Sequence, residues 1–178
     1  MKIAIVGSAG RTGSVNAEEY QKLLDFLKTK VPADARLVSG GAALADHLAV
    51  DLFLSGHVQK LKIYAPCPWD GESFIDTGDR DWRTNPGGLA NYYHRKFSKS
   101  TGKDSLNEIN QAIEKGAVFN CKYSGFHTRN TQIARADKLI ALTFGSGDEP
   151  DDGGTLDTWK KAKSHKVHYP IRTLLKGS

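Results

Sequence analysis

The 178-residue sequence has little of several features that mark special classes of protein. Its two cysteines, Cys67 and Cys121, lie far apart and belong to no CxxC pair, so a disulfide scaffold is not expected. We expect two reduced thiols in a cytoplasmic protein. No apolar run approaches the roughly 20 residues of a membrane span, so a membrane is not an expected partner. Residues 1–6 are too short for a signal-peptide core and indicate a first strand.

Acidic residues are missing from the C-terminal end. All 20 lie at or before Asp157, whereas residues 159–178 carry six of the 25 Lys and Arg residues. The tail is therefore +6 and the rest of the chain is 19 − 20 = −1, which together give the net charge of +5. Because basic charge is not spread over the fold, nucleic acid is not an expected partner. The tail is open to two interpretations: a solvated helix face, or a site for phosphates or a partner.

Short apolar strands alternate with amphipathic helices along the chain. This pattern predicts one α/β domain over residues 1–178, with a mainly parallel, doubly wound sheet flanked by helices. Residues 68–103 are polar and turn-rich and form an irregular insert, within which 89–97 is a possible helix. Further helices are expected at 17–30, 43–55, 105–115 and 154–164, and strands at 2–6, 36–39, 61–65, 138–143 and 166–169.

Three glycine turns lie at expected strand ends or just past them. Parallel sheets bind ligands beyond the carboxyl ends of their strands, where glycine lets backbone N–H groups approach a phosphate. The first turn lacks the Lys-Ser/Thr pair of a P-loop and a clean GxGxxG pattern, so a simple tight turn explains it equally well. The ligand-binding candidates from these turns are Gly7, Ser8, Arg11, Gly40, Gly41, Gly153, Gly154 and Thr155.

Polar residues elsewhere join these candidates. Asp46 falls in the first turn of a helix, where a carboxylate is stabilising by itself and is also able to accept a ribose hydroxyl. Arg129 and Asn130 lie on a short helix, and a guanidinium binds phosphate bidentately. The acidic loop 148–152 lacks EF-hand spacing, so we expect a solvated loop with no metal and no cofactor.

The insert is rich in aromatic residues. Trp69, Trp82, Tyr92 and Tyr93 flank its polar turns. They either stack on a base as part of a lid or form a small core of the insert itself, and the sequence does not decide between these alternatives.

Residues 125–158 resemble the SLOG superfamily, in particular the Lonely Guy-type phosphoribohydrolases formerly described as lysine decarboxylases. The resemblance rests on Phe126-His-Thr-Arg-Asn130, Ala136-Asp-Lys-Leu-Ile-Ala-Leu142 and Gly153-Gly-Thr155, and residues 6–8 and 37–41 fit the same pattern. It implies a Rossmann-like sheet, a nucleotide or NAD-derived ligand, and a homodimer. It also implies that Arg129 matches an arginine that assists N-glycosidic cleavage.

The family glutamate does not carry over. Thr158 stands at its position, and Asp157 lies one residue earlier. Cleavage of a ribosyl bond builds a cation that a carboxylate stabilises and threonine cannot. Two hypotheses follow: a nucleotide N-glycosidase with Arg129 and Asp157 as catalytic residues, or a non-catalytic sensor or sequestering protein for a nucleotide signal.

Overall fold

The computed structural model describes residues 1–151 and 153–176. Six strands form one sheet in the order β4-β3-β2-β1-β5-β6, and all neighbouring strands are parallel. The strands are β1 (Lys2–Gly7), β2 (Arg36–Ser39), β3 (Lys60–Tyr64), β4 (Val118–Asn120), β5 (Lys138–Thr143) and β6 (His165–Pro170). The helices are α1 (Ala17–Lys30), α2 (Ala45–Leu54), α3 (Pro86–Thr101), α4 (Ser105–Glu114), α5 (Phe126–Ile133), α6 (Gly153–Lys161) and α7 (Ile171–Lys176). The predicted α/β fold is confirmed.

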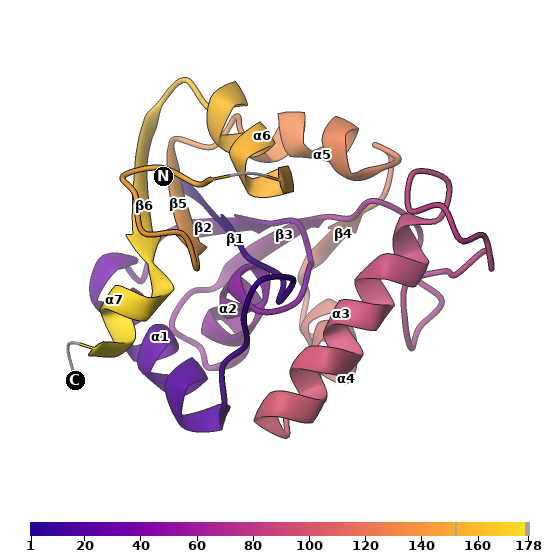
Figure 1. Ribbon diagram of the computed structural model, residues 1–178, viewed down its shortest axis with the longest axis horizontal. Helices are drawn as coiled ribbons and strands as arrows, with labels where there is room; N and C mark the ends of the chain where they lie inside the picture. The colour runs from indigo at the N-terminus through magenta and orange to yellow at the C-terminus, as the bar shows by residue number, and fades with distance from the viewer. Residues whose placement is uncertain (152, 177–178) are drawn as a thin grey trace.

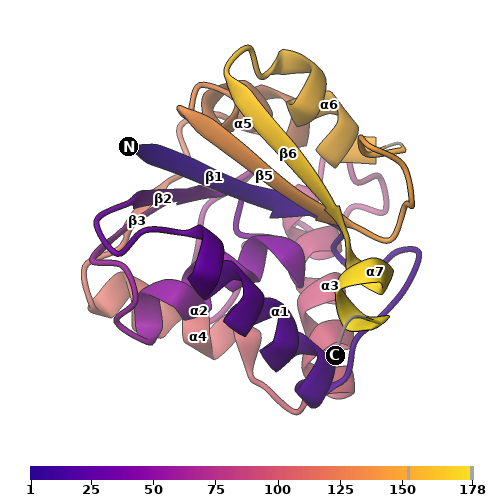
Figure 2. The same ribbon diagram turned by 90° about the vertical axis from the view of Figure 1, so that its left-hand side faces the viewer.

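Helices cover both faces of the sheet (Figure 1). α5 and α6 lie on one face, and α1, α2, α3, α4 and α7 lie on the other (Figures 1 and 2). Side chains of a strand alternate between faces, so Ile3 and Ile5 of β1 enter the larger core while Ala4 and Val6 enter the smaller one. Burial on both sides explains why β1 reads as a continuous apolar run.

The start of α1 is set by a local sequence signal, a capping box. The Glu19 N–H donates to Asn16 Oδ1 at 2.8 Å, and the Asn16 N–H donates to Glu19 Oε1 at 3.0 Å. This capping box satisfies two backbone donors that the first helical turn leaves without partners. The predicted range 17–30 matches α1.

The chain reverses direction across the sheet at β1. From β1 it builds β2, β3 and β4 outward on one side, and then returns to add β5 and β6 on the other side. The crevice between the carboxyl ends of β1 and β5 is therefore the switch point where such sheets bind ligands. Gly7 ends β1 there, and a Cβ at this position would overlap the Leu142 carbonyl and lie 2.6 Å from the Ala45 Cβ.

Two parts of the chain differ from expectation. The insert expected over 68–103 is irregular only up to residue 85, because α3 begins at Pro86, is capped by the Asn85 side chain, and ends at Gly102 with φ 75°. A proline at the first helical position and a left-handed glycine at the end are ordinary helix signals. The helix α7 at the C-terminal end was not predicted; it packs against α1 (Figure 2).

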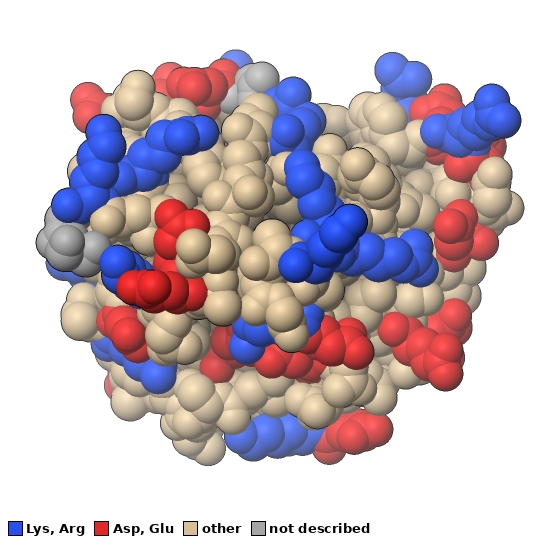
Figure 3. Space-filling model, turned by 60° about the horizontal axis from the view of Figure 1, so that its bottom comes forward, with Lys and Arg blue, Asp and Glu red and all other residues tan. Residues whose placement is uncertain are grey.

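No helix within the described ranges is long and apolar enough to cross a membrane. Cys67 and Cys121 are both free thiols. Lysine and arginine side chains are interspersed with acidic ones on the face that Figure 3 shows. This agrees with the near-neutral balance expected outside the C-terminal tail.

Candidate functional site

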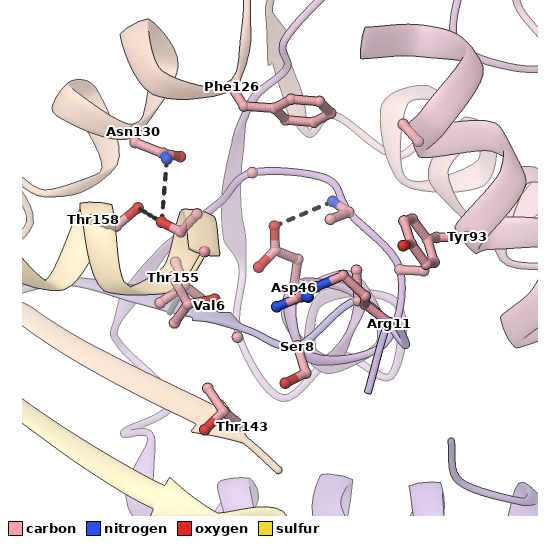
Figure 4. Close-up of a pocket in the computed structure, with 18 of the residues that line it drawn as sticks. Val6, Ser8, Arg11, Asp46, Tyr93, Phe126, Asn130, Thr143, Thr155 and Thr158 are labelled. Atoms are coloured by element: carbon pink, nitrogen blue, oxygen red, sulfur yellow. Dashed lines mark hydrogen bonds between the residues drawn. The ribbon is translucent and has the colours of Figure 1, made fainter. Parts of the chain in front are cut away.

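A cavity of about 940 Å³ opens at the carboxyl ends of β1, β2 and β5 (Figure 4). It therefore occupies the switch point of the sheet. The three glycine turns predicted from the sequence meet in its wall, and the third of them forms the start of α6. Among the predicted site residues, those that line the cavity are Gly7, Ser8, Arg11, Gly40, Gly41, Asp46, Arg129, Asn130, Gly153, Gly154 and Thr155.

One end of this cavity is suited to an anion. Gly153, Gly154 and Thr155, the first residues of α6, line it, and a helix leaves its first N–H groups without intrahelical partners. The helix dipole adds a partial positive charge at this end. Arg11 and Arg172, both exposed, contribute two cationic side chains to the same wall.

Sequence reasoning missed Arg172 as a site residue. It lies in α7, after the last strand, and its guanidinium carbon lies 5.4 Å from the centre of the Phe144 ring. No local motif marks it, because only the sheet order brings the end of β6 beside the end of β5. Thr143 was also missed, although a polar residue that ends a buried strand is a usable signal.

Arg129 is buried below the second glycine turn. Its Nη1 donates to the carbonyl oxygens of Gly40 and Tyr64, the second at 3.0 Å. A Cβ at Gly40 would overlap this guanidinium, so a larger residue there would displace Arg129. Burial lowers the pKa of Arg129, and the nearby Asp46 charge works against that shift. Arg129 thus holds the turn in place in addition to lining the cavity.

Asp46 is a buried carboxyl group at the centre of the cavity wall (Figure 4). Its Oδ2 accepts the Ala42 N–H at 3.2 Å. Burial raises the pKa of Asp46, and the Arg129 charge and hydrogen bonds from backbone N–H groups oppose this only in part. The sequence left two roles open for Asp46, stabilising the first turn of its helix and contacting a ligand, and its position in α2 at the cavity wall is compatible with both.

Asp157 does not line the cavity. Its Oδ2 lies 3.0 Å from Lys161 Nζ, 3.3 Å from His127 Nδ1 and 3.2 Å from Asn130 Nδ2. Burial works to raise the pKa of Asp157, but these partners, Lys161 first, lower it below its ordinary value. The structure therefore places the predicted catalytic carboxylate in an ion-pair cluster beside the cavity.

Thr158 occupies the place in the wall that Asp157 would need. Its side chain lines the cavity, and its Oγ1 donates to the Gly154 carbonyl at 3.1 Å. Consecutive residues of a helix point about 100° apart, and α6 is regular over Gly153–Lys161. The bulged or shortened turn that would have brought Asp157 inward is absent from this described helix.

A second polar cluster lies on the opposite face of the sheet. His47, Asp51 and Glu108 are the one group of three potential metal ligands in the described ranges. The ammonium group of Lys103 already lies 3.1 Å from Glu108 and 3.7 Å from Asp51. We interpret the cluster as an ion-pair network that joins α2 to α4. The acidic loop 148–152 is described only up to residue 151, and Asp152 lies outside the described residues.

Comparison with known proteins yields one relative. No protein-family model matches the chain, and no solved structure matches it. A protein of Acanthamoeba polyphaga mimivirus, "Uncharacterized protein R261", is 34% identical over an alignment of 178 positions that covers 92% of this chain and 91% of the relative. With this identity over nearly the whole length of both proteins, the chain belongs to the same family as that viral protein.

Proposed function

We propose that this protein binds a nucleotide-type ligand in the cavity at the switch point. The observation that carries the proposal is that the first turn of α6, Arg11 and Arg172 all line this cavity. Phosphate groups are the usual anions bound by a helix N-terminus at a sheet edge. Two cationic side chains at the same place add charge-assisted hydrogen bonds.

Asp46 makes the cavity suited to a phosphorylated sugar and not only to a free phosphate. A carboxylate has about four acceptor positions; the Ala42 N–H, 3.2 Å from Oδ2, takes one of them, and the backbone N–H groups of Gly40 and Gly7 also interact with the carboxyl group. The remaining positions suit the hydroxyl groups of a ribose. The proposed ligand is therefore a nucleoside 5′-monophosphate or a related nucleotide, including an NAD-derived one.

The residues that line the cavity favour binding of the nucleotide without cleavage of its N-glycosidic bond. In the resembling hydrolases a glutamate supplies the catalytic charge, whereas here Thr158 lines the cavity and Asp157 is engaged by Lys161 and His127. We therefore place the role of sensor or sequestering protein first. Hydrolysis of the N-glycosidic bond is the second candidate, because the cavity contains one buried carboxyl group, Asp46, with a raised pKa.

Replacing Arg172 by alanine tests the binding proposal. We expect the dissociation constant for nucleoside 5′-monophosphates to rise about tenfold, because a charge-assisted hydrogen bond to phosphate is lost. Isothermal titration calorimetry with the four common ribonucleoside monophosphates measures the effect. Lys176→Ala removes the same charge one turn further along α7, outside the cavity wall, and should change affinity less than twofold. No binding by the wild-type protein, or equal losses in both variants, would contradict the proposal.

Chromatographic detection of free base in the same samples tests the second candidate. If the nucleotide is cleaved, Asp46→Asn should lower the rate at least 100-fold, because a positioned general acid contributes that much. Asp157→Asn should retain the rate, since Asp157 does not line the cavity. Loss of base release in the Asp157 variant alone would show that the carboxylate has been assigned wrongly. Intact nucleotide throughout would leave binding as the function.

A further inference from the structure

The end of the cavity away from Thr143 is aromatic. Trp82 from the irregular part of the insert, Tyr93 from α3 and Phe126 from the start of α5 all line it, and we refer to these three side chains as the aromatic wall. The Trp82 and Phe126 ring centres lie 6.1 Å apart at an angle of 45°. In Figure 4, Phe126 and Thr143 lie at opposite edges of the cavity with Asp46 between them.

Trp82 is 40% exposed and is one of five large apolar side chains in the described ranges that lie open to solvent. The indole contributes to the cavity wall but does not fill a core, so part of its surface is left to water. The guanidinium of Arg83 lies 5.3 Å from the Trp82 ring centre and that of Arg129 5.4 Å from the Phe126 ring centre. Both rings are therefore anchored by cations from their own segments.

Hydrogen bonds define the loop that carries Trp82. The buried Asn85 side chain donates to Asp76 Oδ1 at 2.7 Å and to the Asp79 carbonyl at 2.9 Å. Its Oδ1 accepts the N–H groups of Thr77 and Gly88, both at 3.1 Å. These four bonds tie the Asn85 side chain to the backbone and side chains of the loop that carries Trp82, whose ring itself packs near Phe126. An aromatic surface that is held in place before binding loses little entropy when a ligand covers it.

The cavity presents the three kinds of group that a nucleotide requires: cations and a helix N-terminus for a phosphate, the Asp46 carboxyl group for a sugar, and the aromatic wall for a base. In Figure 4, Phe126 lies on the far side of Asp46 from Thr143, and Arg11 lies beside Asp46. We propose that the aromatic wall is a base-binding subsite, in which Trp82 packs against the planar heteroaromatic ring of the ligand. This inference rests on the proposed function, and it resolves the two interpretations of the insert aromatics in favour of ligand contact for Trp82; Tyr93 lines the cavity and also packs against the larger core. Trp69, by contrast, packs on Phe74 and Phe119 in the larger core.

A comparison of nucleotides with ribose 5-phosphate tests the subsite. Ribose 5-phosphate has the phosphate and the sugar but no base. Wild-type protein should bind the best of the four ribonucleoside monophosphates at least tenfold more tightly than ribose 5-phosphate, because stacking of a base on an aromatic side chain stabilises the complex. Tenfold corresponds to about 1.4 kcal/mol. Trp82→Ala should remove most of this difference and leave the affinity for ribose 5-phosphate unchanged.

Two further variants separate stacking from disturbance of the fold. Trp82→Phe retains an aromatic ring. It should keep at least half of the difference in binding free energy between the best nucleotide and ribose 5-phosphate. Tyr92→Ala removes an aromatic ring that is 58% exposed on the same helix as Tyr93 but does not line the cavity, and it should bind like wild type. Circular dichroism and the melting temperature check that each variant is folded.

The outcomes distinguish the subsite from the function on which it rests. Equal affinities of wild-type protein for ribose 5-phosphate and all four nucleotides would overturn the base-binding subsite and leave the anion site standing. A Trp82→Ala variant that loses affinity equally for both kinds of ligand would also overturn it. Failure of wild-type protein to bind any of these five compounds would overturn the proposed function and the subsite together.

Discussion

Replacing Arg129 by alanine should lower the free energy of unfolding by about 3 to 5 kcal/mol at pH 7.5, the cost of removing one partner from a buried charge pair. The Asp46 carboxyl group would lose the buried cation that favours its charged form. The carbonyl oxygens of Gly40 and Tyr64 would lose a donor as well. Urea denaturation measures the change. Arg135→Ala removes an exposed arginine just after the same helix and should cost less than about 0.5 kcal/mol.

The pH dependence of this loss identifies its cause. A carboxyl group whose pKa is raised in the folded state binds more protons when folded, so stability falls as pH rises from its ordinary pKa near 4 through the raised value. Without Arg129 the pKa of Asp46 should rise further, so the loss should shrink between pH 7.5 and pH 5. Adding Asp46→Asn to Arg129→Ala should recover part of the stability. A loss that is the same at both pH values, or no larger than that of Arg135→Ala, would contradict this account.

His94 should make the protein sensitive to acid. Burial, with a smaller contribution from His47, lowers the pKa of His94 to about 3. Its Nε2 lies 2.8 Å from the Gly41 carbonyl oxygen, which only accepts, so Nε2 carries the proton. Its Nδ1 lies 2.8 Å from Ser105 Oγ and accepts from it. The neutral ring thus joins α3 to the second glycine turn of the cavity.

The sign of the effect follows from the two pKa values. An unfolded histidine titrates near 6.5, so between that value and about 3 the unfolded chain binds more protons than the folded one. The stability that His94 contributes is therefore complete above pH 6.5 and is lost as the pH falls toward 3. We expect a loss of about 2 kcal/mol between pH 7.5 and pH 5, and about 4 to 5 kcal/mol near pH 3.

Comparison with His94→Gln isolates this contribution from the other titrating groups. Glutamine retains a donor and an acceptor but does not titrate, so the stability difference between wild type and variant should narrow by about 2 kcal/mol as the pH falls from 7.5 to 5. His165→Gln changes an exposed histidine on β6 and serves as the control for the substitution itself. Parallel profiles for wild type and His94→Gln would show that His94 is not the acid-sensitive group.

Much of the fold could be predicted because local patterns report burial directly. The apolar run of β1, the capping box of α1 and the polar stop after each strand all follow from which groups meet water and which backbone donors lack partners. The length of α3 was underestimated at its two ends, because Pro86-Gly-Gly88 indicates a turn and the serine and threonine residues at 98–101 are weak helix formers. Its proline start and glycine end were the more reliable signals.

The candidate site was less predictable than the fold. The glycine turns were recognised, but their convergence depended on the order of the strands. Arg129 was identified as a cation near the sheet edge, yet its hydrogen bonds to Gly40 and Tyr64, 89 and 65 residues away, have no local signature. Asp157 and Thr158 are consecutive residues of α6, so their side chains point in different directions, and only Thr158 lines the cavity.

The sequence by itself determined the alternation of strands and helices, the glycine turns at strand ends and the threonine at position 158, where the hydrolases that it resembles have glutamate. These are properties of neighbouring residues, set by periodicity and backbone freedom. Only the tertiary structure decided that Arg172 and the first turn of α6 line one cavity and that Trp82 and Phe126 lie side by side in its wall. Such contacts depend on which strands pair and on how each helix is oriented. Both are set by packing between residues that lie far apart in the chain.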